Sequence, residues 1–198
     1  VSEFGEMTAM TNGVSGFQAI ELNLSCPNIE NGALFSHSGE LTANAVAAVK
    51  ENTGLPVLAK LAPNVPDVTV IAQAAANAGA DALTISNTLP AMQIDIETRK
   101  PMLGAVTGGL SGHGLRPVAL ALVYRAAQVV NIPIIGVGGI FNANHALEYF
   151  LAGASAIQIG SANLVDLWSP FHVLDELEVY LGEAGISDIK DLIGAVRP

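Results

Sequence analysis

The sequence predicts an α/β fold, a (β/α)8 TIM barrel of which this chain supplies only strands four to eight. Short apolar runs bounded by Gly, Pro or Asn alternate with longer segments of helical periodicity, which is typical of a parallel sheet covered by helices. Two segments also resemble each other, AGADALTISN and AGASAIQIG, because each passes from a helix end through Gly into a strand. A closed barrel has eight strands and about 250 residues. Residues 1–198 are therefore expected to be the C-terminal part of a single domain.

The expected strands are short and mostly apolar, as in parallel sheets that are buried on both faces. They lie at residues 19–26, 57–61, 82–87, 133–138 and 156–160.

Helices are expected between these strands, where apolar residues recur at spacings of three and four. Pro66 is expected at the first position of one helix, with Val70 on its apolar stripe. Asn142 is expected to cap a later helix. Trp168 and Phe171 are expected to pack the last long helix onto the barrel.

A long insertion interrupts this alternation. Between Asn87 and Arg116 lie about thirty residues rich in Gly, Thr and Pro, which exceed an ordinary connection. Because barrels build their sites from the loops at the C-terminal ends of strands, this insertion is expected to contribute to a site.

Composition excludes several classes of protein. Hydrophobic residues make up 51% and charged residues 13%, which excludes a disordered chain. One Cys excludes a disulfide scaffold and favours a reducing cytoplasm. A net charge of −10 with only 8 Lys and Arg gives no basic face for nucleic acid. No apolar run has the roughly 18 residues of a membrane span, no secretory signal opens the chain, and the missing initiator Met suggests an incomplete sequence.

Two consecutive strands end in glycine-bearing turns, within IIGVGGI (134–140) and IQIGSAN (157–163). Gly138, Gly139, Gly160 and Ser161 can present backbone N–H groups and a hydroxyl to one anion, since a Cβ would keep the backbone from phosphate oxygens. Barrels commonly bind phosphate in the loops after strands seven and eight. The turns alone leave FMN, a sugar phosphate and a nucleotide open as ligands, and they could also be tight turns without a ligand.

The lone cysteine follows a strand, in the segment Asn23-Leu24-Ser25-Cys26-Pro27-Asn28. Pro27 ends the ladder, so Cys26 is expected at the C-terminal rim of the sheet, where barrel chemistry takes place. Asn23 and Asn28 offer amide groups suited to a planar, carbonyl-rich ligand. A free Cys can also be a small buried hydrophobic residue. The spacing of the His residues indicates no metal site.

Several motifs in series resemble the dihydroorotate dehydrogenase family, and their order and spacing match across nearly the whole chain. They are NLSCPN, AKLAPN, SNT, TRKPMLG, GGLSG, IIGVGGI and IGSA. Cys rather than Ser in the first motif points to the soluble class 1 of the family. The stretch from SNT to GGLSG is most similar to the class 1B catalytic subunit. The family's N-terminal third has no counterpart in the chain, so activity of this chain by itself is not implied.

The resemblance implies an FMN enzyme that oxidises dihydroorotate to orotate in de novo pyrimidine (UMP) biosynthesis. Cys26 would be the base that removes the C5 proton while a hydride passes from C6 to flavin N5. The residues implied to bind FMN are Asn23, Lys60, Ser86, Gly112, Gly138, Gly139, Gly160 and Ser161. Those implied to bind the substrate are Asn23, Asn28, Asn87 and Thr88.

The resemblance also implies a homodimer. A class 1A enzyme would use fumarate as electron acceptor, whereas class 1B would pass electrons to a partner subunit carrying FAD and an iron–sulfur cluster, and then to NAD. The chain contains no ligand set for a cluster, so FAD and the cluster would belong to that partner.

Three alternatives remain open. The flavin domain of dihydropyrimidine dehydrogenase shares these motifs, but its acid Cys lies in the loop beyond this strand, and residues 29–40 contain no Cys. A barrel similar to inosine monophosphate dehydrogenase would place its Cys after a later strand, in a stretch that is Cys-free here. A non-catalytic half-barrel would keep only the phosphate or FMN site.

Overall fold

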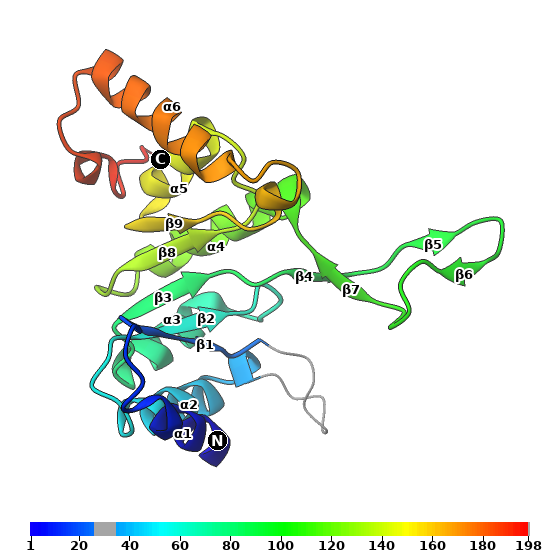
Figure 1. Ribbon diagram of the computed structural model, residues 1–198, viewed down its shortest axis with the longest axis vertical. Coiled ribbons are helices and arrows are strands. Elements are labelled where there is room, and N and C mark those ends of the chain that lie inside the picture. The colour runs from blue at the N-terminus through cyan, green and yellow to red at the C-terminus, as the bar shows by residue number, and fades with distance from the viewer. Residues whose placement is uncertain (26–34, 198) are drawn as a thin grey trace.

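A parallel sheet of five strands forms the centre of the computed structural model, which describes residues 1–25 and 35–197. The strands follow one another in sequence order, and each is paired in parallel with the next (Figure 1). They are β1 (Ile20–Asn23), β2 (Val57–Leu61), β3 (Ala82–Ile85), β8 (Ile134–Val137) and β9 (Ala156–Gln158). Parallel neighbours in sequence order are the arrangement of a βα barrel.

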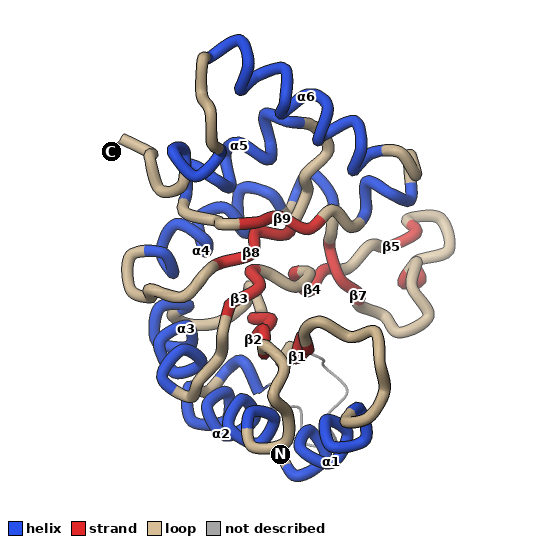
Figure 2. The backbone as a smooth tube through the Cα atoms, turned by 60° about the vertical axis from the view of Figure 1, so that its left-hand side comes forward, coloured by secondary structure: helices blue, strands red, loops and turns tan. Residues whose placement is uncertain are grey.

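Helices cover one face of the sheet, as Figure 2 shows. Between the strands lie α2 (Gly39–Lys50), α3 (Val68–Asn77), α4 (Arg116–Ala127) and α5 (Ala143–Ala152), and α6 (Ser169–Ala184) follows β9. None of the helices in the described residues combines the length and apolar character that a membrane crossing needs.

The sheet is curved, with its concave face away from the helices. Glu21 on β1 and Gln158 on β9 form a hydrogen bond of 2.9 Å although these are the two outermost strands of the sheet. A flat sheet would hold five strands apart by several spacings of about 4.8 Å, so the bond shows that the sheet curls as in a barrel.

The two faces of the sheet differ in burial because side chains alternate along each strand. On β2, Val57, Ala59 and Leu61 are fully buried against the helices, whereas Leu58 and Lys60 on the concave face are half-buried. Full burial of an aliphatic side chain contributes about 1.5–3 kcal/mol, so the layer between sheet and helices is the main source of stability.

Among the described residues, side-chain caps begin three of the α-helices, and two of these caps test predictions. Asn142 caps α5, as predicted, by accepting a hydrogen bond of 3.0 Å from the N–H of His145. The placement of Pro66 was wrong, because Asp67 is the N-cap of α3 and accepts from Thr69 N–H at 3.0 Å. The helix therefore starts later than expected, and Val70 is 54% exposed instead of lying on the buried face.

Helix α1 (Ser2–Thr11) was not predicted, since it carries no apolar stripe. Its buried positions are the small residues Gly5 and Thr8. Phe4 anchors it by an edge-on contact of 5.2 Å between ring centroids with Phe35, which opens the short helix η1 (Phe35–His37).

Four of the five predicted strands were too long, whereas β2 matches its predicted range of residues 57–61. β1 stops at Asn23 and residues 24–25 form a turn, and β3, β8 and β9 also stop before the predicted ends. The last residues of these predicted strands do not pair with a neighbouring strand. They belong instead to the loops at the carboxyl edge of the sheet, where a barrel builds its site.

The insertion after β3 forms a two-part ribbon that projects from the carboxyl edge of the sheet, at the right of Figure 1. Its base pairs β4 (Leu89–Ala91) with β7 (Gly108–Leu110), and its tip pairs β5 (Ile94–Asp95) with β6 (Lys100–Pro101). We call residues 89–110 the arm. A short helix, η2 (Gly112–Gly114), leads back to α4.

Trp168 and Phe171 do not pack the last long helix onto the barrel, so this prediction was wrong. Their side chains are 63% and 56% exposed, and they contact each other with ring centroids 5.5 Å apart. The buried positions of α6 are instead Ser169, Val173 and Leu177. Two short helices, η3 (Ser161–Leu164) and η4 (Ile189–Leu192), flank α6 along the chain.

Candidate active site

Two neighbouring cavities lie at the carboxyl edge of the sheet, and both are lined by Asn87 and Thr88. The first, which we call the glycine cavity, has a volume of about 280 Å³. The second, the asparagine cavity, has a volume of about 290 Å³. The glycine cavity is lined by Lys60, Ser86, Asn87, Thr88, Ser111, Gly112, Leu115, Val137, Gly138, Gly139, Ile140, Gly160, Ser161 and Leu164. The asparagine cavity is lined by Asn23, Ser25, Ala62, Asn64, Asn87, Thr88, Pro90, Thr107, Gly108 and Gly109.

The predicted site residues divide between these cavities. Lys60, Ser86 and all the predicted phosphate-binding glycines meet in the glycine cavity together with Ser161. Asn23 lines the asparagine cavity. Cys26 and Asn28 lie outside the described residues.

The segments after β3, β8 and β9 and the segment around η2 line the glycine cavity, and the turn after β8 contacts the segment around η2. Gly139 follows β8 with φ +66°, and a Cβ there would lie 2.8 Å from the Cβ of Arg116. Only glycine permits this close approach of the β8 turn to the start of α4. Gly112 also has a positive φ, of +75°, and faces Ser161 across the cavity.

The geometry of these turns fits a phosphate group. A Cβ added to Gly160 would meet no atom of the described residues within 4 Å, although Gly160 lines the cavity. The space next to its backbone is therefore open to a ligand rather than filled by packing. Backbone N–H groups that can be approached in this way bind phosphate oxygens well.

Tyr149 supports the glycine cavity from behind and was not found from the sequence. Its ring is fully buried, and its hydroxyl donates a hydrogen bond of 2.7 Å to the carbonyl of Gly138. Burial raises the pKa of the Tyr149 hydroxyl, so it stays protonated and able to donate. Gly136 makes room for the ring, since a Cβ there would overlap it. Sequence periodicity marks Tyr149 only as a core position of α5.

A hydrogen-bonded cluster forms the floor of the asparagine cavity. The Oδ1 atom of Asn23 accepts from Ser25 Oγ at 3.1 Å and from Asn87 Nδ2 at 3.0 Å. Asn87 Nδ2 also donates to Ser25 Oγ at 2.5 Å, and Asn87 Oδ1 accepts from Thr88 N–H at 2.8 Å. These bonds fix the orientation of both amides.

The fixed amides leave a donor for a ligand. Among residues 1–25 and 35–197, the Nδ2 group of Asn23 donates no hydrogen bond, so it can donate to a carbonyl oxygen in the cavity. Ser25 is a further polar residue of this site that the prediction missed, although it stands within the NLSCPN motif.

Lys60 brings the positive charge of the site. It extends from β2 on the concave face of the sheet, and its Nζ lies 3.3 Å from Oε1 of Glu21. Burial favours the neutral form of Glu21, but hydrogen bonds from Gln158 and Thr84 and the charge of Lys60 outweigh it, and they lower the pKa of Glu21. The carboxylate of Glu21 is thus ionised at neutral pH.

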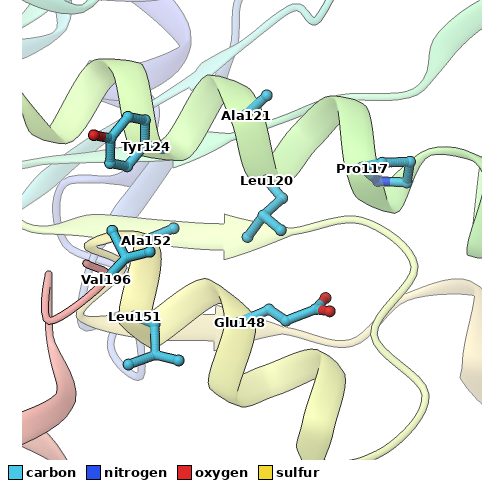
Figure 3. Close-up of a pocket in the computed structure, with 8 residues that line it drawn as sticks. All are labelled: Pro117, Leu120, Ala121, Tyr124, Glu148, Leu151, Ala152 and Val196. Carbon is cyan, nitrogen blue, oxygen red and sulfur yellow. The ribbon is translucent and has the colours of Figure 1, made fainter. Parts of the chain in front are cut away.

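A larger cavity of about 450 Å³ lies elsewhere, between α4 and α5 on the helical layer. Figure 3 shows its lining, to which α4 contributes Leu120 and Tyr124 and α5 contributes Leu151. Val196 of the C-terminal segment also lines it. Of the described residues in this lining, only Glu148 is charged. Because the cavity lies away from the carboxyl edge of the sheet and offers few polar groups, it is a poor place for chemistry on a polar substrate.

Comparison with known proteins decides the family. The sequence model described as dihydroorotate dehydrogenase matches residues 2–181 of the chain.

The chain belongs to the dihydroorotate dehydrogenase family.

Several curated relatives carry the name dihydroorotate dehydrogenase B (NAD(+)), catalytic subunit. The protein of Desulforudis audaxviator (strain MP104C) is 51% identical over 198 residues, which are 100% of this chain and 64% of that protein. The protein of Geobacter sp. (strain M21) is 45% identical over 198 residues, 100% of this chain and 65% of that protein. The chain thus spans less than two thirds of the length of these relatives. The resemblance to this family and to its class 1B subunits is confirmed.

Solved structures of the family have the same fold. A dihydroorotate dehydrogenase (DHODH) of Eimeria tenella, in complex with ferulenol, superposes with a TM-score of 0.78 at 25% identity, covering 97% of this chain and 57% of that one. The ligand-free structure of that enzyme gives a TM-score of 0.74 at 27% identity, and the match covers 91% of this chain and 56% of that chain. The predicted fold class, part of a (β/α)8 barrel, is confirmed.

Proposed function

We propose that this chain forms the FMN-binding and substrate-binding part of a dihydroorotate dehydrogenase, which oxidises dihydroorotate to orotate in de novo pyrimidine biosynthesis. The observation that carries the proposal is the pair of adjacent cavities that share Asn87 and Thr88. Oxidation by a flavin requires the substrate and the flavin ring in contact, and two cavities with a common wall allow this contact.

The glycine cavity is the proposed FMN site. Gly138, Gly139, Gly160 and Ser161 bind the phosphate with backbone N–H groups and a hydroxyl, and Lys60 lies toward the ring. Gly112 and Ser86 contact the flavin through their backbone. When bound, FMN accepts the two electrons of the oxidation, and a cation near its ring stabilises the reduced form.

The asparagine cavity is the proposed substrate site. The dihydroorotate ring carries amide N–H and carbonyl groups, to which the amides of Asn23 and Asn87 and the hydroxyl of Thr88 offer matching donors and acceptors. Asn28 completes this set in the proposal. Cys26 is the proposed base for the C5 proton. Since a free thiol has a pKa of about 8.5, its surroundings must lower that value for work at neutral pH.

The arm supports a homodimer in the proposed assembly. Several large apolar side chains on it are exposed, including Ile96 at 87% and Met102 at 57%. The arm has no net charge, because its two acidic residues, Asp95 and Glu97, are balanced by two basic residues, Arg99 and Lys100. The whole chain, in contrast, has a net charge of −10. A second copy meets the least repulsion at such a neutral surface.

The name of the curated relatives supports an electron-transfer partner. Those proteins are called the catalytic subunit of an NAD(+) enzyme, so we propose a second subunit that carries FAD and an iron–sulfur cluster and passes electrons to NAD. We place the assembly in the cytoplasm, with residues 1–198 as the C-terminal part of its single FMN-binding barrel domain.

Replacement of the proposed base tests this function. In the FMN-loaded full-length polypeptide, Cys26→Ser is expected to slow dihydroorotate oxidation by orders of magnitude at neutral pH, because a hydroxyl is a far weaker base than a thiol. FMN affinity should stay unchanged, which serves as the internal control. Unchanged turnover in this variant contradicts the role of Cys26. Tight FMN binding by the unmodified protein without any turnover would favour a non-catalytic binding module.

A further inference from the structure

The carboxylate of Glu21 gathers donors from three other strands on the concave face of the sheet. Thr84 Oγ1 on β3 and Gln158 Nε2 on β9 donate to its Oε2 at 2.7 and 2.9 Å. Lys60 Nζ on β2 lies 3.3 Å from its Oε1. Both oxygens are thereby engaged, so the position of the carboxylate is fixed from several sides.

Glu21 reaches the two cavities only through a neighbour. Lys60 stands in register with Asn23 on one side and with Thr84 on the other. Lys60 lines the glycine cavity and Asn23 lines the asparagine cavity, whereas Glu21, two residues before Asn23, lines neither. The contact of Glu21 with the glycine cavity therefore runs through the Lys60 ammonium group.

A lysine on a long flexible stem needs a partner to hold a single position. An opposite charge at 3.3 Å supplies this partner, and it also weakens the field of the ammonium at more distant points. The side chains of Lys60 and Glu21 are 24% and 28% exposed, so water screens their interaction only in part.

We infer that Glu21 is a positioning residue for Lys60, which fixes the ammonium at the wall of the glycine cavity and offsets part of its charge toward bound FMN. The inference rests on the proposed function, because it needs FMN in that cavity. A full positive charge beside the ring would favour reduced FMN strongly, and Glu21 moderates this preference.

The reduction potential of bound FMN tests the inference. Glu21→Gln keeps the shape of the side chain and removes its charge. In the FMN-loaded full-length polypeptide, it is expected to raise the affinity for reduced relative to oxidised FMN about tenfold, which equals about 30 mV for a two-electron couple. Glu178→Gln, which removes the same charge from the exposed side of α6, is the matched control and should leave the potential unchanged.

A double-mutant cycle separates this role from a general structural one. In a Lys60→Met background, the shift caused by Glu21→Gln should be clearly smaller, because only the direct field of the carboxylate remains and no ammonium group is left to be displaced. If Glu21→Gln does not fold, Glu21→Asp takes its place and should give a smaller shift in the same direction, since its carboxylate lies one methylene farther from Nζ.

The outcomes are distinct. A shift no larger than that of Glu178→Gln, or an equal shift without Lys60, overturns the role of Glu21 and leaves the proposed function intact. Failure of the unmodified protein to bind FMN overturns both.

Discussion

The hydroxyl of Tyr149 donates a hydrogen bond of 2.7 Å to the carbonyl oxygen of Gly138, and this bond ties α5 to the turn that forms the glycine cavity. The tyrosine is fully buried and Gly138 has a φ of +137°, so the bond supports a turn in a conformation that favours glycine. The shape of the proposed phosphate site thus depends on a residue that lines neither cavity.

Tyr149→Phe is expected to remove this bond while keeping the ring in its place. The buried carbonyl of Gly138 then has no donor from Tyr149, which should lower the free energy of unfolding by about 1–3 kcal/mol. FMN affinity should fall as well, because the turn is held less firmly. Urea denaturation and FMN titration measure the two effects. Tyr124→Phe, on the exposed side of α4, is the control, and equal behaviour of the two variants would contradict the supporting role.

Asn87→Ala tests the wall that the two cavities share. The substitution removes the donor to Asn23 Oδ1 and Ser25 Oγ and the acceptor for Thr88 N–H. We expect KM for dihydroorotate to rise about tenfold or more, since each lost hydrogen bond costs roughly 1 kcal/mol and the remaining amide is no longer oriented.

The control for this change is Asn77→Ala on the exposed side of α3. Steady-state kinetics of the full-length enzyme should show normal KM for this variant. A normal KM for Asn87→Ala as well would remove the asparagine cavity as the substrate site.

Asp81 links acid stability to a specific contact. Its Oδ2 accepts from Lys50 Nζ at 2.8 Å and from Val57 N–H at 2.7 Å, and it is chiefly the Lys50 bond that lowers the pKa of Asp81 below its usual 3.8. Because the folded pKa is lowered, this stabilisation is complete above pH 3.8 and is lost as the pH falls from there through the folded pKa.

Asp81→Asn should therefore show a smaller loss of unfolding free energy on acidification than the unmodified protein. Urea denaturation between neutral and acidic pH measures the slope. Asp175→Asn, in an exposed position of α6, should keep the unmodified slope. Parallel slopes for all three proteins would show that the Lys50 contact has no part in acid stability.

Ile96→Asp tests the arm as the surface between two copies. The side chain is 87% exposed at the tip of the arm, and a charge there would be desolvated in a dimer contact. The dimer dissociation constant should rise at least about tenfold, corresponding to 1.4 kcal/mol. Sedimentation measures it, with Met7→Asp on α1, at a residue that is 69% exposed, as control. A dimer unaffected by Ile96→Asp would place the interface elsewhere.

Local patterns were enough to predict the strands and the turns of the glycine cavity. Short apolar runs mark parallel strands, and glycines at the ends of β8 and β9 mark the turns that line the glycine cavity. The caps show the limit of such patterns. Pro66 is a plausible first helical residue, but the Asp67 carboxylate can accept a backbone N–H, and that bond decides where α3 begins.

Contacts between distant parts of the chain could not be predicted. Glu21 and Gln158 are 137 residues apart and meet only because the sheet curls. Tyr149 has the periodicity of a core residue, and nothing local shows that its hydroxyl meets Gly138. Helix α1 lacks an apolar stripe, because it packs through Phe4 and small residues.

FMN titration of the full-length apoprotein, with Gly160→Ala beside Gly182→Ala, tests the central claim most directly. Within residues 1–25 and 35–197, a Cβ at either glycine meets no atom within 4 Å, and neither position has a positive φ. Both variants should therefore fold, but only Gly160 lines the glycine cavity. The proposal predicts tight FMN binding by the unmodified protein and by Gly182→Ala, and binding weaker by at least about tenfold for Gly160→Ala, whose methyl group occupies the space of the phosphate. Equal FMN affinity in all three proteins would contradict the assignment of the glycine cavity.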